Sequence, residues 1–89
     1  MEEEFTHKPE VICDWDYFID ILFDKKTRLF IDSIRTCQNN DIINNNNLHI
    51  MFEPNEISGI QDRVIENSRF FNKIFTFNHK ILDSCENSY

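Results

Sequence analysis

Apolar residues recur at helical spacing through the last third of the chain. They lie mostly on one face of a 3.6-residue period, at Ile57, Ile60, Val64, Phe71, Ile74, Phe75, Ile81 and Leu82. This pattern predicts a long C-terminal helix over residues 56–83, with either Asn55 or Ser58 as its N-cap. Because a helix of about 40 Å is long for so small a chain, a break near 67–68 or at Asn78 is a further expectation.

Three shorter segments are rich in residues that favour strands, namely 10–13, 29–34 and 48–52. The segment between the first two has two interpretations. Helical spacing of its apolar residues predicts a helix over 15–26 with Asp14 as its N-cap, and we favour this interpretation. Alternation of apolar residues between 17 and 23 instead favours a strand that turns and forms a hairpin with 28–35.

The resulting element order is β-α-β-β-α, which predicts a small α+β protein built as a two-layer sandwich with a long C-terminal helix. An asparagine-rich stretch over residues 38–47 is typical of a loop and separates the second predicted strand from the third. With 89 residues in total, the chain is expected to form one domain over 10–85, between an acidic tail at 1–9 and a short tail at 86–89.

Charge is distributed unevenly along the chain. The net charge is −7, and the whole excess lies in residues 1–24, which hold eight acids against one base. Such a chain is not expected to bind nucleic acid directly, because phosphate binding uses clustered Lys and Arg. The Glu-rich start is unlike a secretory or mitochondrial leader, and no apolar run approaches the roughly 20 residues that span a bilayer. A soluble intracellular protein with no membrane partner is therefore predicted.

The sequence offers no recognisable catalytic or cofactor-binding motif. Gly59 is its sole glycine, which excludes a glycine-rich phosphate loop. Cys13, Cys37 and Cys85 are widely spaced and odd in number, which predicts free thiols rather than a zinc site or a disulfide framework. His49 is expected on the sheet surface or as a cap. We therefore predict a protein that is not an enzyme and that uses no cofactor, no metal ion and no small-molecule substrate.

Two short stretches carry a resemblance to a known family. Val11-Ile12-Cys13-Asp14 ends the first predicted strand, and Leu48-His49-Ile50-Met51-Phe52 forms the third. Both resemble the smallest subunit of the transcription and DNA repair factor TFIIH, the trichothiodystrophy group A protein family, which has a hydrophobic-Cys-Asp signature and a Thr-His-hydrophobic strand. The predicted element order is similar to that family as well. The chain departs from the pattern at Trp15, where the family has Pro, and at 46–48, where the family has an acidic pair and Thr.

The resemblance implies a non-catalytic subunit of a nuclear complex for transcription and nucleotide excision repair. Its partner would be a larger subunit of similar fold, or a second copy when the chain is alone. Such a role requires an apolar surface that the isolated chain leaves uncovered. We expect four residues to bind the partner: Phe30, Ile50, Phe52 and Phe70.

An acidic inhibitor or immunity-type protein is the alternative interpretation. The charge of the N-terminal quarter would then block a basic site on a partner enzyme. Four aspartates are expected to form this acidic patch: Asp14, Asp16, Asp20 and Asp24. Neutralising them would abolish binding and leave folding intact.

Overall fold

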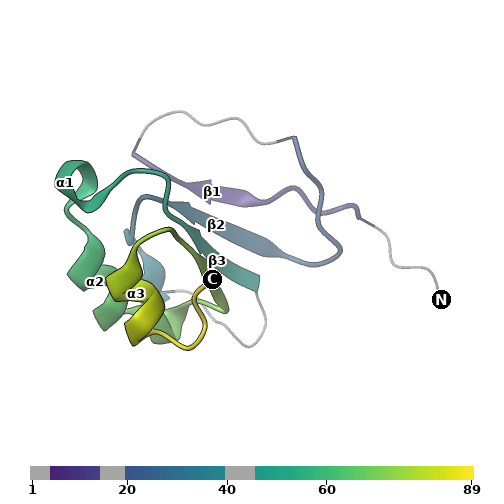
Figure 1. Ribbon diagram of the computed structural model, residues 1–89. Coiled ribbons are helices and arrows are strands. Elements are labelled where there is room, and N and C mark those ends of the chain that lie inside the picture. The colour runs from purple at the N-terminus through teal and green to yellow at the C-terminus, as the bar shows by residue number, and fades with distance from the viewer. Residues whose placement is uncertain (1–4, 15–19, 40–45) are drawn as a thin grey trace.

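A parallel β-sheet lies at the centre of the protein (Figure 1). The computed structural model describes residues 5–14, 20–39 and 46–89. These residues form four strands: β1 (Glu10–Ile12), β2 (Thr27–Ile31), β3 (Asn46–Ile50) and β4 (Lys73–Phe75). All four are parallel and lie in the order β1-β2-β3-β4, so that each strand pairs with the next one along the chain. The described chain is thus a small α/β protein, and the three predicted strands are confirmed with shifts of a few residues.

The strand register places side chains in columns across the sheet. Ile12 pairs with Phe30, Phe30 with His49, and His49 with Ile74. All four side chains are buried. Since side chains alternate between the two faces of a strand, these residues share one face, and we call them the helix-face column.

Within the described residues, five short helical segments connect or follow the strands: η1 (Cys37–Asn39), α1 (Asn55–Ser58), α2 (Gln61–Glu66), η2 (Ser68–Phe70) and α3 (His79–Ser84). Figure 1 shows α2 and α3 side by side on one side of the sheet. Val64 of α2 and Ile81 of α3 are fully buried and join residues of the helix-face column in one hydrophobic core. None of the helices in the described residues has the length and apolar character needed to cross a bilayer.

The long helix predicted over 56–83 is wrong, because α1, α2, η2, β4 and α3 stand in its place. Gly59 ends α1 with a φ of 64°, in the left-handed region that glycine adopts at low cost. Asn67 ends α2, and Asn78 begins α3 by accepting a hydrogen bond from the backbone N–H of Ile81 at 3.1 Å. The breaks expected near 67–68 and at Asn78 are therefore confirmed.

The helix predicted over 15–26 is wrong for residues 20–26, which contain none; residues 15–19 lie outside the described residues. Phe23 instead forms an antiparallel bridge with His7, through backbone hydrogen bonds of 2.8 and 3.0 Å. The hairpin interpretation fails too, because β2 pairs in parallel with both of its neighbours. The predicted two-layer β-α-β-β-α sandwich is thereby corrected to an α/β arrangement around a parallel sheet.

The last residues of the chain lie beside β4. The backbone N–H of Ile74 donates to the carbonyl of Asn87 at 2.9 Å, and Tyr89 donates to the carbonyl of Ile74 at 2.8 Å. The pairing is parallel, with Ser88 opposite Ile74. Segment 87–89 therefore extends the sheet by one further position in the same direction, where a short tail is predicted. Likewise, residues 46–47 of the predicted asparagine-rich loop belong to β3.

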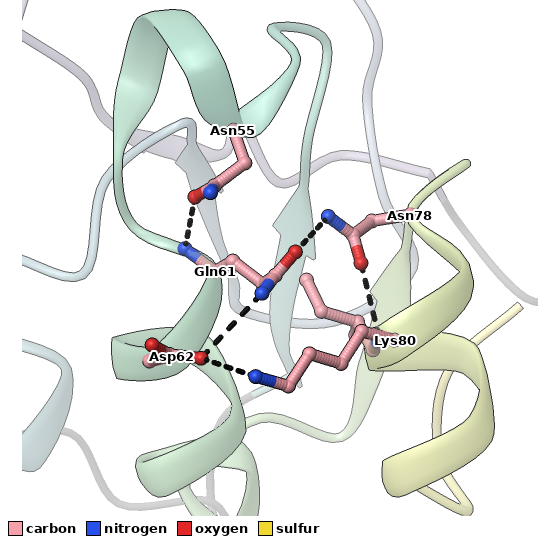
Figure 2. A network of polar contacts seen from close by, with 6 residues as sticks. Asn55, Gln61, Asp62, Asn78 and Lys80 are labelled. Atoms are coloured by element: carbon pink, nitrogen blue, oxygen red, sulfur yellow. Dashed lines mark hydrogen bonds and ion pairs between the residues drawn. The ribbon is translucent and has the colours of Figure 1, made fainter.

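A polar network joins the start of α2 to α3 (Figure 2). Asn55 accepts a hydrogen bond from the backbone N–H of Gln61 at 3.1 Å. The N-cap residues of α1 and α2 are Pro54 and Ile60, so neither Asn55 nor Ser58 is the N-cap that was predicted. The Gln61 side chain accepts from Asn78 at 2.8 Å and donates to Asp62 at 3.5 Å. Lys80 Nζ lies 3.0 Å from Asp62 Oδ1, and the hydrogen bonds from Lys80 and Gln61 hold the pKa of Asp62 below its usual value. These contacts fix the two helices relative to each other.

Candidate functional site

On the face of the sheet opposite the helices, the side chains become more exposed from β2 to β4. We call this face the open face, and it carries the residues that alternate with the helix-face column: Leu29, Ile31, Leu48, Ile50, Lys73, Phe75 and, beyond β4, Tyr89. Three of its residues align across the strands, Ile31 with Ile50 and Ile50 with Phe75. Ile31 is fully buried, Ile50 is half-buried and Phe75 is 39 % exposed. Exposure therefore rises toward the C-terminal edge of the sheet.

Phe75 and Tyr89 form an aromatic pair at that edge. Their ring centroids lie 5.9 Å apart, with the ring planes inclined by 30°. Lys73 Nζ lies 5.9 Å from the centroid of the Tyr89 ring, a cation–π contact. Tyr89 is 61 % exposed. Two large rings and an ammonium group thus face solvent at a place where a parallel sheet normally has a second covering layer.

A hollow of about 510 Å³ opens on the same face, near the amino ends of the strands. Its described lining combines two apolar side chains, two lysines, one aspartate and two asparagines: Leu48, Phe75, Lys25, Lys73, Asp24, Asn46 and Asn72. A volume of this size lies within the roughly 300–1,000 Å³ of typical ligand pockets. The hollow and the aromatic pair share Phe75, so they form one continuous candidate surface.

The structure separates the four residues predicted to bind a partner. Phe30 is completely buried in the helix-face column, so it is a core residue that has no surface to offer. Ile50 lies on the open face, and Phe52 follows two residues later with 53 % of its side chain exposed. Phe70 is half-buried against the core, with the guanidinium of Arg69 4.9 Å from its ring centroid. Of the four, Ile50 has a place on the candidate surface, and Phe52 lies in the segment that follows β3.

The four aspartates predicted to form an acidic patch do not gather among the described residues. Asp14 follows β1, at the carboxyl end of the sheet, and lies 3.6 Å from Arg35 in an exposed ion pair. Asp24 precedes β2 at the opposite, amino end, where it lines the hollow. Asp20 is exposed, and Asp16 lies outside the described residues. The helical face that would have aligned these side chains is not formed over 20–26.

Two polar side chains of β3, Asn47 and His49, are completely buried. Within the described part of the chain, neither ring nitrogen of His49 and neither amide atom of the Asn47 side chain makes a hydrogen bond of regular geometry. The Phe71 ring packs edge-on against His49, with 5.1 Å between the ring centroids. Burial lowers the pKa of His49 to about 4, a shift that the nearby backbone of Ser33 partly opposes. His49 is therefore a neutral core residue at pH 7, not the surface or capping residue expected.

A second hollow, of about 380 Å³, lies at the carboxyl ends of β1 and β2. Ligands of open α/β sheets usually bind at this edge. Here the carboxylate of Asp32 accepts hydrogen bonds from the backbone N–H groups of Phe52 and Glu53 at 3.0 and 3.1 Å. Arg35 donates to the carbonyl oxygen of Cys13 at 3.0 Å. These polar groups therefore tie the chain's own loops to the end of the sheet.

The described residues offer neither a cluster of metal ligands nor an activated thiol. No three His, Cys, Asp or Glu side chains within those residues gather closely enough to hold a metal ion. Cys13, Cys37 and Cys85 carry free thiols. Burial raises the pKa of the Cys37 thiol, which keeps that sulfur protonated and inert at neutral pH.

The sequence interpretation misses the residues that define the candidate surface. It places Phe75 on the buried face of a long helix, Lys73 on that same helix and Tyr89 in a tail. A signal for β4 is nevertheless present, because residues 74–77 are a continuous run of aromatic and β-branched residues. Giving that run priority over the helical period would have exposed both Lys73 and Phe75 on one face of a strand.

Known proteins add nothing to this geometry. Comparison with family models, with curated proteins and with solved structures finds no match to the chain. The open face and its hollow are the structural features that bear on function.

Proposed function

We propose that the chain is a non-catalytic interaction protein, which works by burying the open face of its sheet against another polypeptide. The observation that carries the proposal is that the open face of this parallel sheet is exposed at β4 and Tyr89. All-parallel sheets are normally covered on both faces, because their strands are apolar on both sides. Here the chain's own helices cover one face, whereas Phe75 and Tyr89 on the other are 39 % and 61 % exposed. A partner would supply the missing layer.

The order of the strands supports the same role. Each strand pairs with the next one along the chain, and segment 87–89 continues the series beyond β4. Solenoid proteins stack successive units in one direction in the same way and bind partners on extended surfaces. The likeness concerns architecture only, since one fold can serve many functions.

The polar groups at the carboxyl end of the sheet support a role without catalysis. Asp32 and Arg35 line the hollow at that end, and both bind backbone atoms of the chain itself. Side chains held in this way stabilise the fold, and they would have to release these contacts in order to act on a substrate.

Membership of TFIIH is a narrower proposal. Among the residues that carry the resemblance, Cys13 and Asp14 follow β1, and His49 is buried in the core. The element order that the resemblance implies differs from the observed one, because β4 interrupts the expected helix. Co-purification with the other TFIIH subunits from nuclear extract would support membership. Their absence would refute it and leave the open face as the interaction surface.

The acidic inhibitor is the weaker of the two functional candidates. Its patch requires four neighbouring carboxylates, but Asp14 and Asp24 lie at opposite ends of the parallel sheet. The open face also carries Lys73 beside its aromatic pair, which a surface selected to block a basic site would not favour.

Site-specific photo-cross-linking tests the proposed interaction surface. A benzophenone amino acid replaces Phe75 in one variant and Ile57 in a matched control, since Ile57 is also apolar and is 70 % exposed, on α1. In native cells, the variant at position 75 is expected to form a covalent adduct with one partner chain, and the control is not. The Phe75→Asp protein, which cannot cross-link, is then added as a competitor. It should fail to displace wild-type protein from that partner.

The proposal is refuted if positions 75 and 57 give the same adducts, or if neither gives any. Circular dichroism and urea denaturation of each variant show that the fold is retained. Retention is expected because Phe75 and Ile57 both lie at the surface, where substitutions usually change stability by less than about 1 kcal/mol.

A further inference from the structure

The hollow on the open face has a charge that sets it apart from the rest of the protein. Two of its described lining residues, Lys25 and Lys73, are cationic, and one, Asp24, is anionic. The chain as a whole carries a net charge of −7. A locally positive hollow in an acidic protein is a feature that a partner can recognise by charge complementarity.

Neither lysine is neutralised by an ion pair in the described part of the chain. The ion pairs there join Arg28 to Glu10, Arg35 to Asp14 and Lys80 to Asp62. The Lys73 ammonium lies 5.9 Å from the centroid of the Tyr89 ring, and this contact leaves its three N–H groups able to donate to an acceptor. The two ammonium groups are therefore available to carboxylates from outside.

Apolar surface lies between these charges. Leu48 and Phe75 line the hollow, and the exposed ring of Tyr89 stacks beside Phe75 at its edge. A large apolar side chain entering a hollow of about 510 Å³ would cover this surface. Flanking carboxylates on the same segment would then meet Lys25 and Lys73.

We propose that the hollow binds an acidic segment of a partner protein that carries a large apolar residue, with Lys25 and Lys73 pairing to its carboxylates and Leu48 and Phe75 receiving the apolar side chain. This inference rests on the proposed function and names the chemistry of the partner. A basic partner is disfavoured at this place, because its cations would face two ammonium groups against a single carboxylate.

Two short fluorescein-labelled peptides provide the test. One alternates glutamate and leucine, and the other replaces every glutamate by lysine, so that apolar content and length are equal. Fluorescence anisotropy at low salt is expected to show tighter binding of the acidic peptide to wild-type protein. Raising the salt concentration should weaken that binding, since exposed ion pairs are screened.

Charge reversal in the protein identifies the residues involved. The double variant Lys25→Glu/Lys73→Glu is expected to weaken acidic-peptide binding roughly tenfold or more, as two lost pairs and two new repulsions imply. Arg63→Glu is the matched control, because Arg63 is exposed and lies on α2, which covers the opposite face of the sheet. Its affinity for the acidic peptide should stay close to that of the wild type.

Three outcomes of the peptide experiments overturn the inference. They are equal or tighter binding of the basic peptide, no detectable binding of either peptide, and an unchanged affinity in the double lysine variant. Sedimentation that shows a dimer of the wild type, and a monomer for Phe75→Asp, also overturns it and identifies the occupant as a second copy. The cross-linking experiment tests the proposed function separately, and that function fails if positions 75 and 57 give the same adducts or if neither gives any.

Discussion

The two faces of the sheet are built from the same strands, but their side chains differ in how far they are buried. On the helix face, Phe30 and Ile74 are completely buried, although they stand on different strands of the sheet. On the open face, burial is complete at Ile31 and is lost by Phe75. The helix face is uniformly buried because α2 and α3 pack on it (Figure 1). On the open face, side-chain exposure rises from β2 to β4.

This difference shows that residue type does not decide which side of a parallel strand is buried. Phe30 and Phe75 are both phenylalanines in strands, and the placement of the connecting segments separates a core residue from a surface residue. The exposed member of such a pair is the one free to act on another molecule.

Truncation of the two phenylalanines gives the sharpest contrast between the faces. Phe30→Ala is expected to reduce the free energy of unfolding by about 3–5 kcal/mol, since it opens a cavity in a packed core. Phe75→Ala should reduce it by less than about 1 kcal/mol. Urea denaturation measures both, and Phe30→Leu, which keeps most of the volume, should fall between them. Equal losses for the two alanine variants would contradict the assignment of the faces.

The buried imidazole of the helix face makes its stability depend on pH. The pKa of His49 is lowered from 6.5 to about 4 in the folded chain. The unfolded chain therefore binds a proton below pH 6.5 that the folded chain does not, and acidification from pH 7 to pH 4 should cost roughly 3 kcal/mol. That stability is complete above pH 6.5 and declines as the pH falls.

Two variants isolate this contribution in urea denaturation across the pH range. His49→Phe removes the titrating ring while keeping a core aromatic, and the loss between pH 6.5 and pH 4 should shrink by that amount. His79→Gln is the control, because His79 is exposed, and its stability should follow the wild type. A parallel response of His49→Phe and wild type would show that the imidazole does not carry the effect.

The end of the sheet provides a third, smaller contrast. Asp32 has a φ of 47° and accepts hydrogen bonds from the backbone of Phe52 and Glu53. Asp32→Ala should cost about 2 kcal/mol, because two amides lose their acceptor and alanine tolerates that φ poorly. Asp32→Asn keeps one oxygen and suits the left-handed region, so it should cost about half as much. Thermal unfolding should rank the wild type as most stable, then Asp32→Asn, then Asp32→Ala. A reversed order would show that the carboxylate does not stabilise this end of the sheet.

The smallest effect is expected within the open face itself. A double-mutant cycle of Phe75→Ala and Tyr89→Ala should give a coupling energy of about 0.5–1 kcal/mol in the isolated chain. The same cycle measured on partner binding should give a larger coupling, since both rings would then be desolvated. A coupling near zero in both measurements would mean that the two rings act independently.

The strand segments at 10–13, 29–34 and 48–52 could be predicted, because β-branched and aromatic residues concentrate there. The break at Asn78 was also within reach, since asparagine caps helices well. β4 was harder to recognise, because Phe71 and Ile74 fit a helical period, although the run at 74–77 favours a strand. Parallel pairing left no local signal either, since no tight turn joins the paired strands.

The candidate site was predicted only in part, for a related reason. Alternation in 48–52 fixes that Ile50 and Met51 lie on opposite faces, but not which face the helices cover. The structure buries Met51 and leaves Ile50 half-buried. Phe30 was misplaced by the same ambiguity, and only the tertiary position of α2 and α3 resolves it.

The pairing of each strand with its successor has a consequence for how the chain folds. Every pairing closes a loop of roughly 20 residues, so the entropy lost at each closure is modest and similar. No strand of the described sheet pairs with one that is remote from it in the sequence. The sheet can therefore assemble by successive additions, and its rate of folding should exceed that of sheets of equal size whose neighbours are remote in sequence.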